Sequence, residues 1–325
     1  MRDRPLVSIV VASYNHERFI GQAIESVWRQ SYRPIELVVV DDGSNDSSWA
    51  LLKAMAEHSP IPMRVVAQEN RGPGSAFGHG VDLAKGEWLC ILASDDFYAD
   101  DFVERNMNVG TNLEGARWVL HSNAHLVEED GTLAGTMDAI ASRVPLEGEA
   151  FELMVTGGGR LLPSTMFVRR DVFLDAGGFD PTMIAEDTDL QLRLARHARF
   201  HYIRDPIFYS RYSPGSLGKQ PWAWGDSIIR AISKHQDILG SRLPGLLSKA
   251  SENISSSCFE HGRPSEGLAW ARHSLAYAQG PTAKSATAIR LAVRMVRAHA
   301  RLVALRLFPR ERLVRIKRRL AGQEG

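Results

Sequence analysis

The stretch "CILASDDFY", residues 90–98, leads from an apolar run directly into two adjacent aspartates. A short apolar run of this kind predicts a buried strand. Asp95 and Asp96 follow it, although neighbouring carboxylates repel each other and are disfavoured beside apolar groups. In open α/β sheets, ligands bind outside the carboxyl ends of the strands. The stretch therefore predicts a strand that carries two acids into a ligand site.

Strand and helix patterns alternate before this stretch. Strands are expected at 6–12, 35–40, 63–68 and 87–93, with helices at 16–30 and 48–58 and a third helix that opens in the glycine-rich segment 70–80. Further strands are expected at 116–122, 164–170 and 199–203, a helix at 186–198, and an irregular segment at 128–148. This order predicts an α/β fold with a mostly parallel, Rossmann-like central sheet flanked by helices.

Strand patterns stop near residues 213–221, and only helix patterns follow. We therefore expect a domain at 1–215, with halves of about 1–100 and 101–215, and a helical C-terminal region at 216–325. Trp222 and Trp224 beside this boundary are candidates either for stacking on a sugar or for packing against the helices.

The two cysteines, Cys90 and Cys258, lie too far apart for a disulfide framework or a metal motif, which favours a reducing compartment. The first apolar run spans only residues 6–12, too short for a secretory signal or a membrane span, and no apolar stretch reaches 18 residues. We therefore expect a cytoplasmic protein.

Charge is unevenly distributed along the 325 residues. Residues 281–325 hold 12 Lys and Arg against 2 Asp and Glu, whereas the remainder holds 27 against 36. Within this basic tail, Arg290, Arg294, Arg297 and Arg301 share one stripe of a predicted helix. Two interpretations stay open: the tail packs on the protein or on a second copy in a homo-oligomer, or it lies on an anionic membrane surface, the inner face of the plasma membrane. Nucleic acid is not expected, because no stacking or groove-reading motif accompanies the charge.

Polar residues follow each of the first four predicted strands, at 13–15, 41–44, 70–72 and 94–96. Taken singly, "DDGS" is also a common helix-entry turn, and an Asp-Asp pair can cap a helix. Taken together, they indicate one site. Adjacent carboxylates suit Mg²⁺ or Mn²⁺ bound with substrate phosphates, and an aspartate after an earlier strand can accept a hydrogen bond from a base or ribose. The pattern favours a nucleoside diphosphate whose other end is a leaving group.

Three blocks of this sequence resemble glycosyltransferase family 2, the inverting enzymes with the GT-A fold. They are "SIVVASYNHERFIGQAIESVWRQSYRPIELVVVDDGSNDSS", "NRGPGSAFGHGVDLAKGEWLCILASDDFY" and "FVRRDVFLDAGGFDPTMIAEDTDLQLRLARHARFHYI", and the resemblance covers residues 5–212. It implies a metal-dependent enzyme that moves a sugar from a nucleotide-diphosphate sugar to a hydroxyl of a glycan or lipid-linked acceptor, in bacterial surface polysaccharide assembly.

The resemblance also implies roles for individual residues. Asp95 would bind the Mg²⁺ or Mn²⁺, and Asp187 in "AEDTD" would be the general base; Asp41 would read the base of the nucleotide. The residues implied in donor binding are Ser13, Tyr14, Asp41, Arg71 and Asp96.

Two positions depart from the family pattern. Ala93 stands where the family often has Asp, so one contact is missing or is supplied by Ser94, and Phe77 stands where it often has Arg. These departures leave open a non-catalytic sugar-nucleotide binding protein. A sugar nucleotidyltransferase is a third interpretation, but "ASYNHER" lacks the basic, glycine-rich signature that such enzymes usually carry near the N-terminus.

Overall fold

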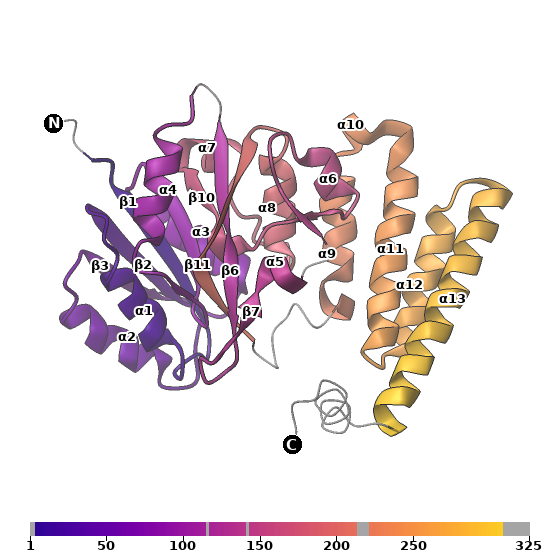
Figure 1. Ribbon diagram of the computed structural model, residues 1–325, viewed down its shortest axis with the longest axis horizontal. Coiled ribbons are helices and arrows are strands. Elements are labelled where there is room, and N and C mark those ends of the chain that lie inside the picture. The colour runs from indigo at the N-terminus through magenta and orange to yellow at the C-terminus, as the bar shows by residue number, and fades with distance from the viewer. Residues whose placement is uncertain (1–3, 115–116, 141–142, 213–220, 308–325) are drawn as a thin grey trace, which may run out of the picture. The chain divides into compact units, whose positions relative to one another are not determined.

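The computed structural model describes residues 4–114, 117–140, 143–212 and 221–307 (Figure 1). The chain forms two compact units, Met1–Ser216 and Leu217–Gly325, which we call unit 1 and unit 2. No helix among the described residues is long and apolar enough to cross a membrane.

Unit 1 is built on one mixed sheet, in the order β3-β2-β1-β4-β10-β6-β11-β5, with β7 paired to β6. The strands are β1 (Val7–Ser13), β2 (Ile35–Asp41), β3 (Met63–Ala67), β4 (Trp88–Ala93), β5 (Phe97–Tyr98), β6 (Trp118–Val127), β7 (Leu133–Thr136), β10 (Phe167–Arg169) and β11 (Arg199–Arg211). The first four strands in this order are parallel, whereas β10 is antiparallel to both neighbours and β5 is antiparallel to β11. The predicted α/β fold with its C-terminal helices is confirmed, and the sheet is parallel mainly in its first half.

Helices cover both faces of this sheet, because successive residues of a strand point to opposite sides. On β1, Ile9 and Val11 pack in one buried cluster with residues of α1, whereas Val10 packs in another with residues of α3. The α3 helix lies especially close to β1, since a Cβ at Gly80 would be 2.3 Å from Val10 Cγ1. The helices are α1 (Ile20–Trp28), α2 (Ser48–Glu57), α3 (Pro73–Leu83), α4 (Phe102–Gly110), α5 (Met137–Ile140), α6 (Phe151–Val155), α7 (Arg170–Asp175) and α8 (Glu186–Leu194).

Two segments of unit 1 differ from the expected elements. The segment 128–148 contains β7, α5 and a two-residue strand, β8 (Val144–Pro145), which pairs with β9 (Gly159–Arg160). Such short elements hold too few apolar residues to show a period. Strand β11 continues to Arg211 rather than ending at residue 203. The polar residues Arg204 and Asp205 interrupt its apolar pattern, and its pairing with β6 is irregular there but resumes afterwards.

Unit 2 is helical, with α9 (Pro221–Ser233), α10 (Gln236–Leu239), α11 (Leu243–Glu260), α12 (Pro264–Tyr277) and α13 (Gly280–Leu307). Ile254, Cys258 and Trp270 form a buried cluster, and Trp224 packs against it. Trp224 therefore takes the packing role, whereas the side chain of Trp222 lies outside the described residues. Both cysteines are free and buried.

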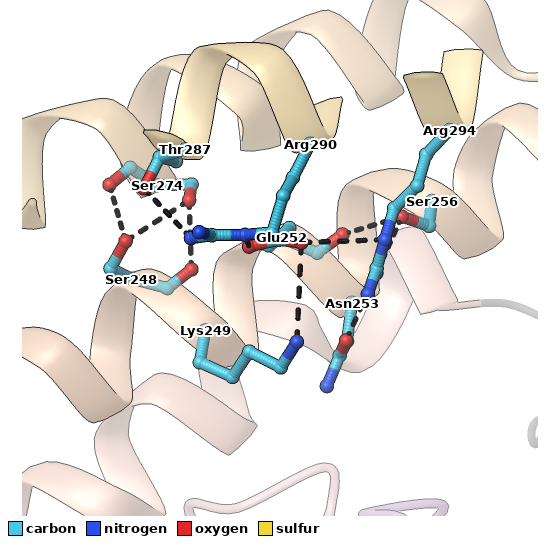
Figure 2. A network of polar contacts seen from close by, with 9 residues as sticks. All are labelled: Ser248, Lys249, Glu252, Asn253, Ser256, Ser274, Thr287, Arg290 and Arg294. Atoms are coloured by element: carbon cyan, nitrogen blue, oxygen red, sulfur yellow. Dashed lines mark hydrogen bonds and ion pairs between the residues drawn. The ribbon is translucent and has the colours of Figure 1, made fainter. Parts of the chain in front are cut away.

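A buried carboxylate joins α13 to α11 (Figure 2). Glu252 on α11 is 0% exposed and lies 3.0 Å from Arg290 Nε, 3.3 Å from Arg294 Nε and 4.0 Å from Lys249 Nζ. Arg290 and Arg294 thus contact Glu252 of the same unit while 48% and 33% of their side chains stay exposed, which agrees with the first interpretation of the tail for these two residues. The side chains of Arg297 and Arg301 lie outside the described residues. Ile289, Val293 and Val296 form an exposed apolar row on α13, at 65%, 44% and 69% exposure.

Candidate functional site at the carboxyl ends of the parallel strands

The loops after β1 and β2 are joined by hydrogen bonds. The Asp41 carboxylate accepts the N–H of Ser44 at 3.0 Å and its hydroxyl at 2.7 Å, and Ser44 Oγ in turn accepts the N–H of Asn15 at 2.9 Å. The side-chain carbonyl of Asn15 accepts the N–H of Asn45 at 2.8 Å. Asn15 has a φ of 52°, a left-handed conformation that is unusual outside glycine and is often found at functional sites. These hydrogen bonds fix the loops after β1 and β2 relative to each other.

Ser13 and Tyr14 offer groups that the protein itself does not use. Ser13 pairs with Asp41 in the sheet register, and its buried hydroxyl has no hydrogen-bond partner in the part of the chain that the structure describes. Leaving a buried hydroxyl unpaired costs about 1–3 kcal/mol, which a ligand oxygen or N–H would recover. The Tyr14 ring beside it is 43% exposed and accessible to a ligand. Both residues therefore suit the predicted donor-binding role.

The loop after β3 is held by Asp42, for which no separate role was predicted within the polar segment 41–44. One oxygen of its carboxylate accepts the N–H of Arg71 at 3.0 Å and the amide of Gln68 at 2.8 Å, and the other accepts the N–H of Gly72 at 2.8 Å. The Arg71 side chain is 69% exposed, with its nearest carboxylate, Glu69, 3.9 Å away. Asp42 thus fixes the backbone of this loop and leaves the Arg71 guanidinium in solvent at the entrance of α3.

The two aspartates of the opening stretch lie in different environments. Asp96 accepts the backbone N–H of Arg211 at 2.8 Å, and burial, reinforced by the charge of Asp95, raises its pKa well above the ordinary value. The carboxylate of half-buried Asp95 has no hydrogen bond or ion pair with any described residue. Ser94 lies beside Ala93, the position that differs from the family pattern. Its hydroxyl lies within hydrogen-bond distance of His16 Nδ1, at 2.7 Å. The charge that remains available at this strand end is that of Asp95.

A divalent cation fits this environment through one protein ligand. Among the described residues, no three His, Cys, Asp or Glu side chains gather so that they could hold a metal ion by themselves. Mg²⁺ in phosphate-transfer and related sites is usually bound by one or two carboxylates together with substrate phosphates and water. Asp95, in the turn after β4, has no partner among the described residues and could supply the protein ligand of a site that substrate phosphates and water complete.

Asp187 and Glu186 form the acidic start of α8. Asp187 Oδ1 accepts the N–H of Thr188 at 2.6 Å and its hydroxyl at 3.3 Å, and burial raises its pKa. Burial, with the charge of Asp187 second, raises the pKa of Glu186 to about 8. A Cβ at Gly74 would lie 3.0 Å from Glu186 Cβ, so α8 begins directly against the first turn of α3. The predicted base is thereby placed on the element that adjoins the Arg71 loop.

Comparison with known proteins finds glycosyltransferases that are similar to this chain. The model of the glycosyl transferase family 2 domain matches residues 8–109, which span β1 to α4. An uncharacterized glycosyltransferase of Rickettsia felis is 28% identical over 209 residues, covering 64% of this chain and 34% of that protein. One from Haemophilus influenzae is 32% identical over 153 residues, covering 46% and 60%. Glycosyltransferase GlyG of Streptococcus pneumoniae is 24% identical over 240 residues, covering 70% and 79%. The chain thus spans only about a third of the first relative and under two thirds of the second.

Solved structures show the same fold. The Staphylococcus aureus protein TarS, residues 1–349, in complex with UDP-GlcNAc superimposes with a TM-score of 0.56 at 18% identity, covering 83% of this chain and 89% of that one. The mannosyltransferase PcManGT of Pyrobaculum calidifontis, in complex with GDP-Man and Mn²⁺, gives 0.53 at 17% identity, covering 91% and 88%. Both are transferases of the GT-A type. Residues 8–109 of this chain therefore match the glycosyl transferase family 2 domain, and the chain has the GT-A fold.

Proposed function

We propose that the protein is a metal-dependent, inverting glycosyltransferase that transfers a sugar from a nucleotide-diphosphate donor to a hydroxyl of a glycan or lipid-linked acceptor, in bacterial surface polysaccharide assembly. One observation carries the proposal: the aligned ends of parallel strands present Asp41 together with the Ser13 hydroxyl and the Asp95 carboxylate, neither of which pairs with a described residue. Register supports it, since Ser13 pairs with Asp41 and Ala12 with Ala93. The nucleotide sugars bound by TarS and PcManGT support the class of donor.

Each residue has a chemical task in this proposal. Ser13, Tyr14 and Asp41 bind the nucleoside, with Arg71 and Asp96 completing the donor site. Asp95 would hold a Mg²⁺ or Mn²⁺, whose charge stabilises the departing diphosphate.

Asp187 accepts the proton of the acceptor hydroxyl while that oxygen bonds to the anomeric carbon and the bond to the diphosphate breaks. The new bond forms opposite the leaving group, so configuration inverts. Burial favours this base, because a raised pKa makes the carboxylate a stronger proton acceptor.

Two substitutions separate donor binding from chemistry. A panel of nucleotide sugars is first screened with Mn²⁺ for thermal stabilisation and donor hydrolysis. We expect Asp95→Asn to abolish the Mn²⁺-dependent part of donor binding. Asp187→Asn should bind donor normally and turn over about 10²–10⁴-fold more slowly, as the loss of a general base typically does. The exposed Asp82→Asn on α3 is the control and should behave as the unmodified protein.

Other outcomes contradict the proposal in distinct ways. Near-normal turnover of folded Asp95→Asn with metal present would refute the metal assignment. Weak donor binding with little change in turnover would make Asp187 a binding residue. Donor binding without hydrolysis or transfer, with every acceptor tried, would support the non-catalytic binding protein instead.

We also propose that α13 and the residues after it lie on the anionic inner face of the plasma membrane. The exposed residues of α13 indicate which of its faces would make the contact. Because Arg290 and Arg294 are paired with Glu252, the membrane side is the exposed row Ile289, Val293 and Val296. The other ten basic residues of 281–325 supply the attraction, at about 1 kcal/mol for each one near the lipid surface.

Vesicle co-sedimentation tests this contact. The unmodified protein should bind vesicles of anionic lipid at low salt and release them as salt is added, because screening weakens the attraction. Glutamates at Ile289 and Val293 should reduce this binding, whereas Leu268→Glu at an exposed apolar position of α12 should not. Equal binding by all three proteins would refute the proposal, and self-association that the double variant abolishes would make the row a contact between copies.

A further inference from the structure

Arg211, the last residue of β11, connects three segments that lie far apart in the sequence. It is only 8% exposed. Its Nε donates to the carbonyl oxygen of Asp95 at 2.9 Å, Nη1 to the carbonyl of Glu129 at 2.7 Å and, more weakly, to that of Glu128 at 3.3 Å. Nη2 donates to the side-chain oxygen of Gln22 at 2.6 Å.

Aromatic rings complete the surroundings of this guanidinium. It lies 4.9 Å from the ring centre of Phe19 and 5.5 Å from that of Phe97, within the range of cation–π attraction. Arg211 forms no ion pair with any residue that the structure describes; its hydrogen bonds go to carbonyl oxygens instead. The Asp96 carboxylate attracts this charge from further away, whereas the direct contacts of the guanidinium are with carbonyl oxygens and hold backbone and amide groups in place.

The contacts of Arg211 fall on both sides of one peptide bond. The guanidinium holds the carbonyl oxygen of Asp95, and the backbone N–H of Arg211 holds the carboxylate of Asp96 at 2.8 Å. The Asp95 carboxylate has no protein partner of its own in the described structure, so its direction depends on the backbone that carries it. Fixing that backbone therefore fixes the position and the Cα–Cβ direction from which the Asp95 carboxylate projects.

We infer that Arg211 is a positioning residue: it holds the Asp95 carboxylate in the geometry required to bind the divalent cation of the donor complex. This inference rests on the proposed function. Groups that orient a metal ligand typically contribute 10–100-fold to metal affinity, because a misdirected ligand must be reorganised when the metal binds. Arginine suits the task better than lysine, since its rigid fork addresses several oxygens at once.

Arg211→Lys tests the inference, because it keeps the charge and most of the apolar stem but loses the fork. We expect the Mn²⁺ concentration that half-saturates donor binding, measured by titration calorimetry with the donor found in the panel, to rise about 10–100-fold. At saturating Mn²⁺, kcat should return close to the unmodified value. A purely structural role would instead lower Tm and leave the Mn²⁺ titration unchanged at temperatures where the protein is folded.

Two further variants make the result decisive. Gln22→Ala removes one partner of the same guanidinium without touching Asp95, so it should raise half-saturating Mn²⁺ by a smaller factor. If Arg211→Lys does not fold, Gln22→Ala replaces it as the test. An unchanged Mn²⁺ titration of Gln22→Ala then overturns the inference. Arg33→Lys is the control, since Arg33 also donates to backbone carbonyls but lies beside the N-terminal end of β2.

Different outcomes would refute the role of Arg211 and the glycosyltransferase proposal on which it rests. An unchanged Mn²⁺ titration in folded Arg211→Lys overturns the role of Arg211 and leaves the glycosyltransferase proposal intact. Absence of any Mn²⁺-dependent donor binding in the unmodified protein overturns both.

Discussion

Glu186→Gln should make the stability of unit 1 less sensitive to pH. Glu186 begins α8 beside Asp187, and its pKa of about 8 arises first from burial and then from the neighbouring charge. At pH 7 the folded protein therefore holds a proton on this group that the unfolded chain, with an ordinary value of 4.5, has released. Glutamine has nearly the same shape as the protonated acid and cannot ionise.

The direction and size of the effect follow from proton linkage. Between pH 4.5 and about 8 the folded state binds more protons than the unfolded state, so the free energy of unfolding falls as pH rises and levels off above pH 8. Each unit of pKa difference corresponds to about 1.4 kcal/mol, which sets a ceiling of about 5 kcal/mol for the whole interval. Because Glu186 keeps part of its surface in water, we expect about 2 kcal/mol.

Denaturant titrations at pH 5, 7 and 9 measure this quantity as a difference between two proteins. Hydrogen exchange of α8 and the β1–β4 strands reports on unit 1, since a chain with two units need not unfold in one step. The stability of Glu186→Gln relative to the unmodified protein should increase by about 2 kcal/mol from pH 5 to pH 9. The exposed Glu57→Gln on α2 is the control. Parallel pH curves for the unmodified protein and Glu186→Gln would refute the argument.

Three further substitutions test packing. Gly80→Ala would place a Cβ 2.3 Å from Val10 Cγ1 and should destabilise unit 1 by about 1–3 kcal/mol in denaturant titrations; an unchanged midpoint would contradict the close α3–β1 contact. Gly225→Ala would meet Trp270 at 2.4 Å and should lower the stability of unit 2 by a similar amount, with hydrogen exchange of unit 1 unaffected. Glu252→Ala leaves Arg290 and Arg294 without their shared partner, so amides of α13 should exchange faster than those of α12; equal protection would show that apolar packing alone holds α13.

The first half of the fold could be predicted because its information is local. Each strand from β1 to β4 is a short apolar run, each helix has its own apolar face, and the polar residues follow the strands directly. The positions of Ser13, Asp41 and Asp95 at strand ends follow from that pattern alone. Their roles in binding and catalysis remain predictions, as does that of Asp187.

The rest depends on contacts between residues distant in the chain. Nothing near Arg211 in the sequence shows that it meets Asp96, from which 115 residues separate it. The tail gives a second example, since helical spacing groups Arg290 with Arg294 but cannot tell which side of the helix faces the protein. That side is set by Glu252, a carboxylate in a serine-rich helix whose composition suggests exposure.

The short strand β5 has a consequence for how the chain reaches its final form. Its two residues pair with β11, through Tyr98↔Phe208 and Phe97↔Tyr209. Pairings between such distant residues form late, since a long loop must close before they bring any gain. During synthesis, β11 leaves the ribosome after every other strand of unit 1. The turn that carries Asp95 and Asp96 can therefore gain its contacts with β11, including the bond from the Arg211 N–H to Asp96, only after this last strand has been made.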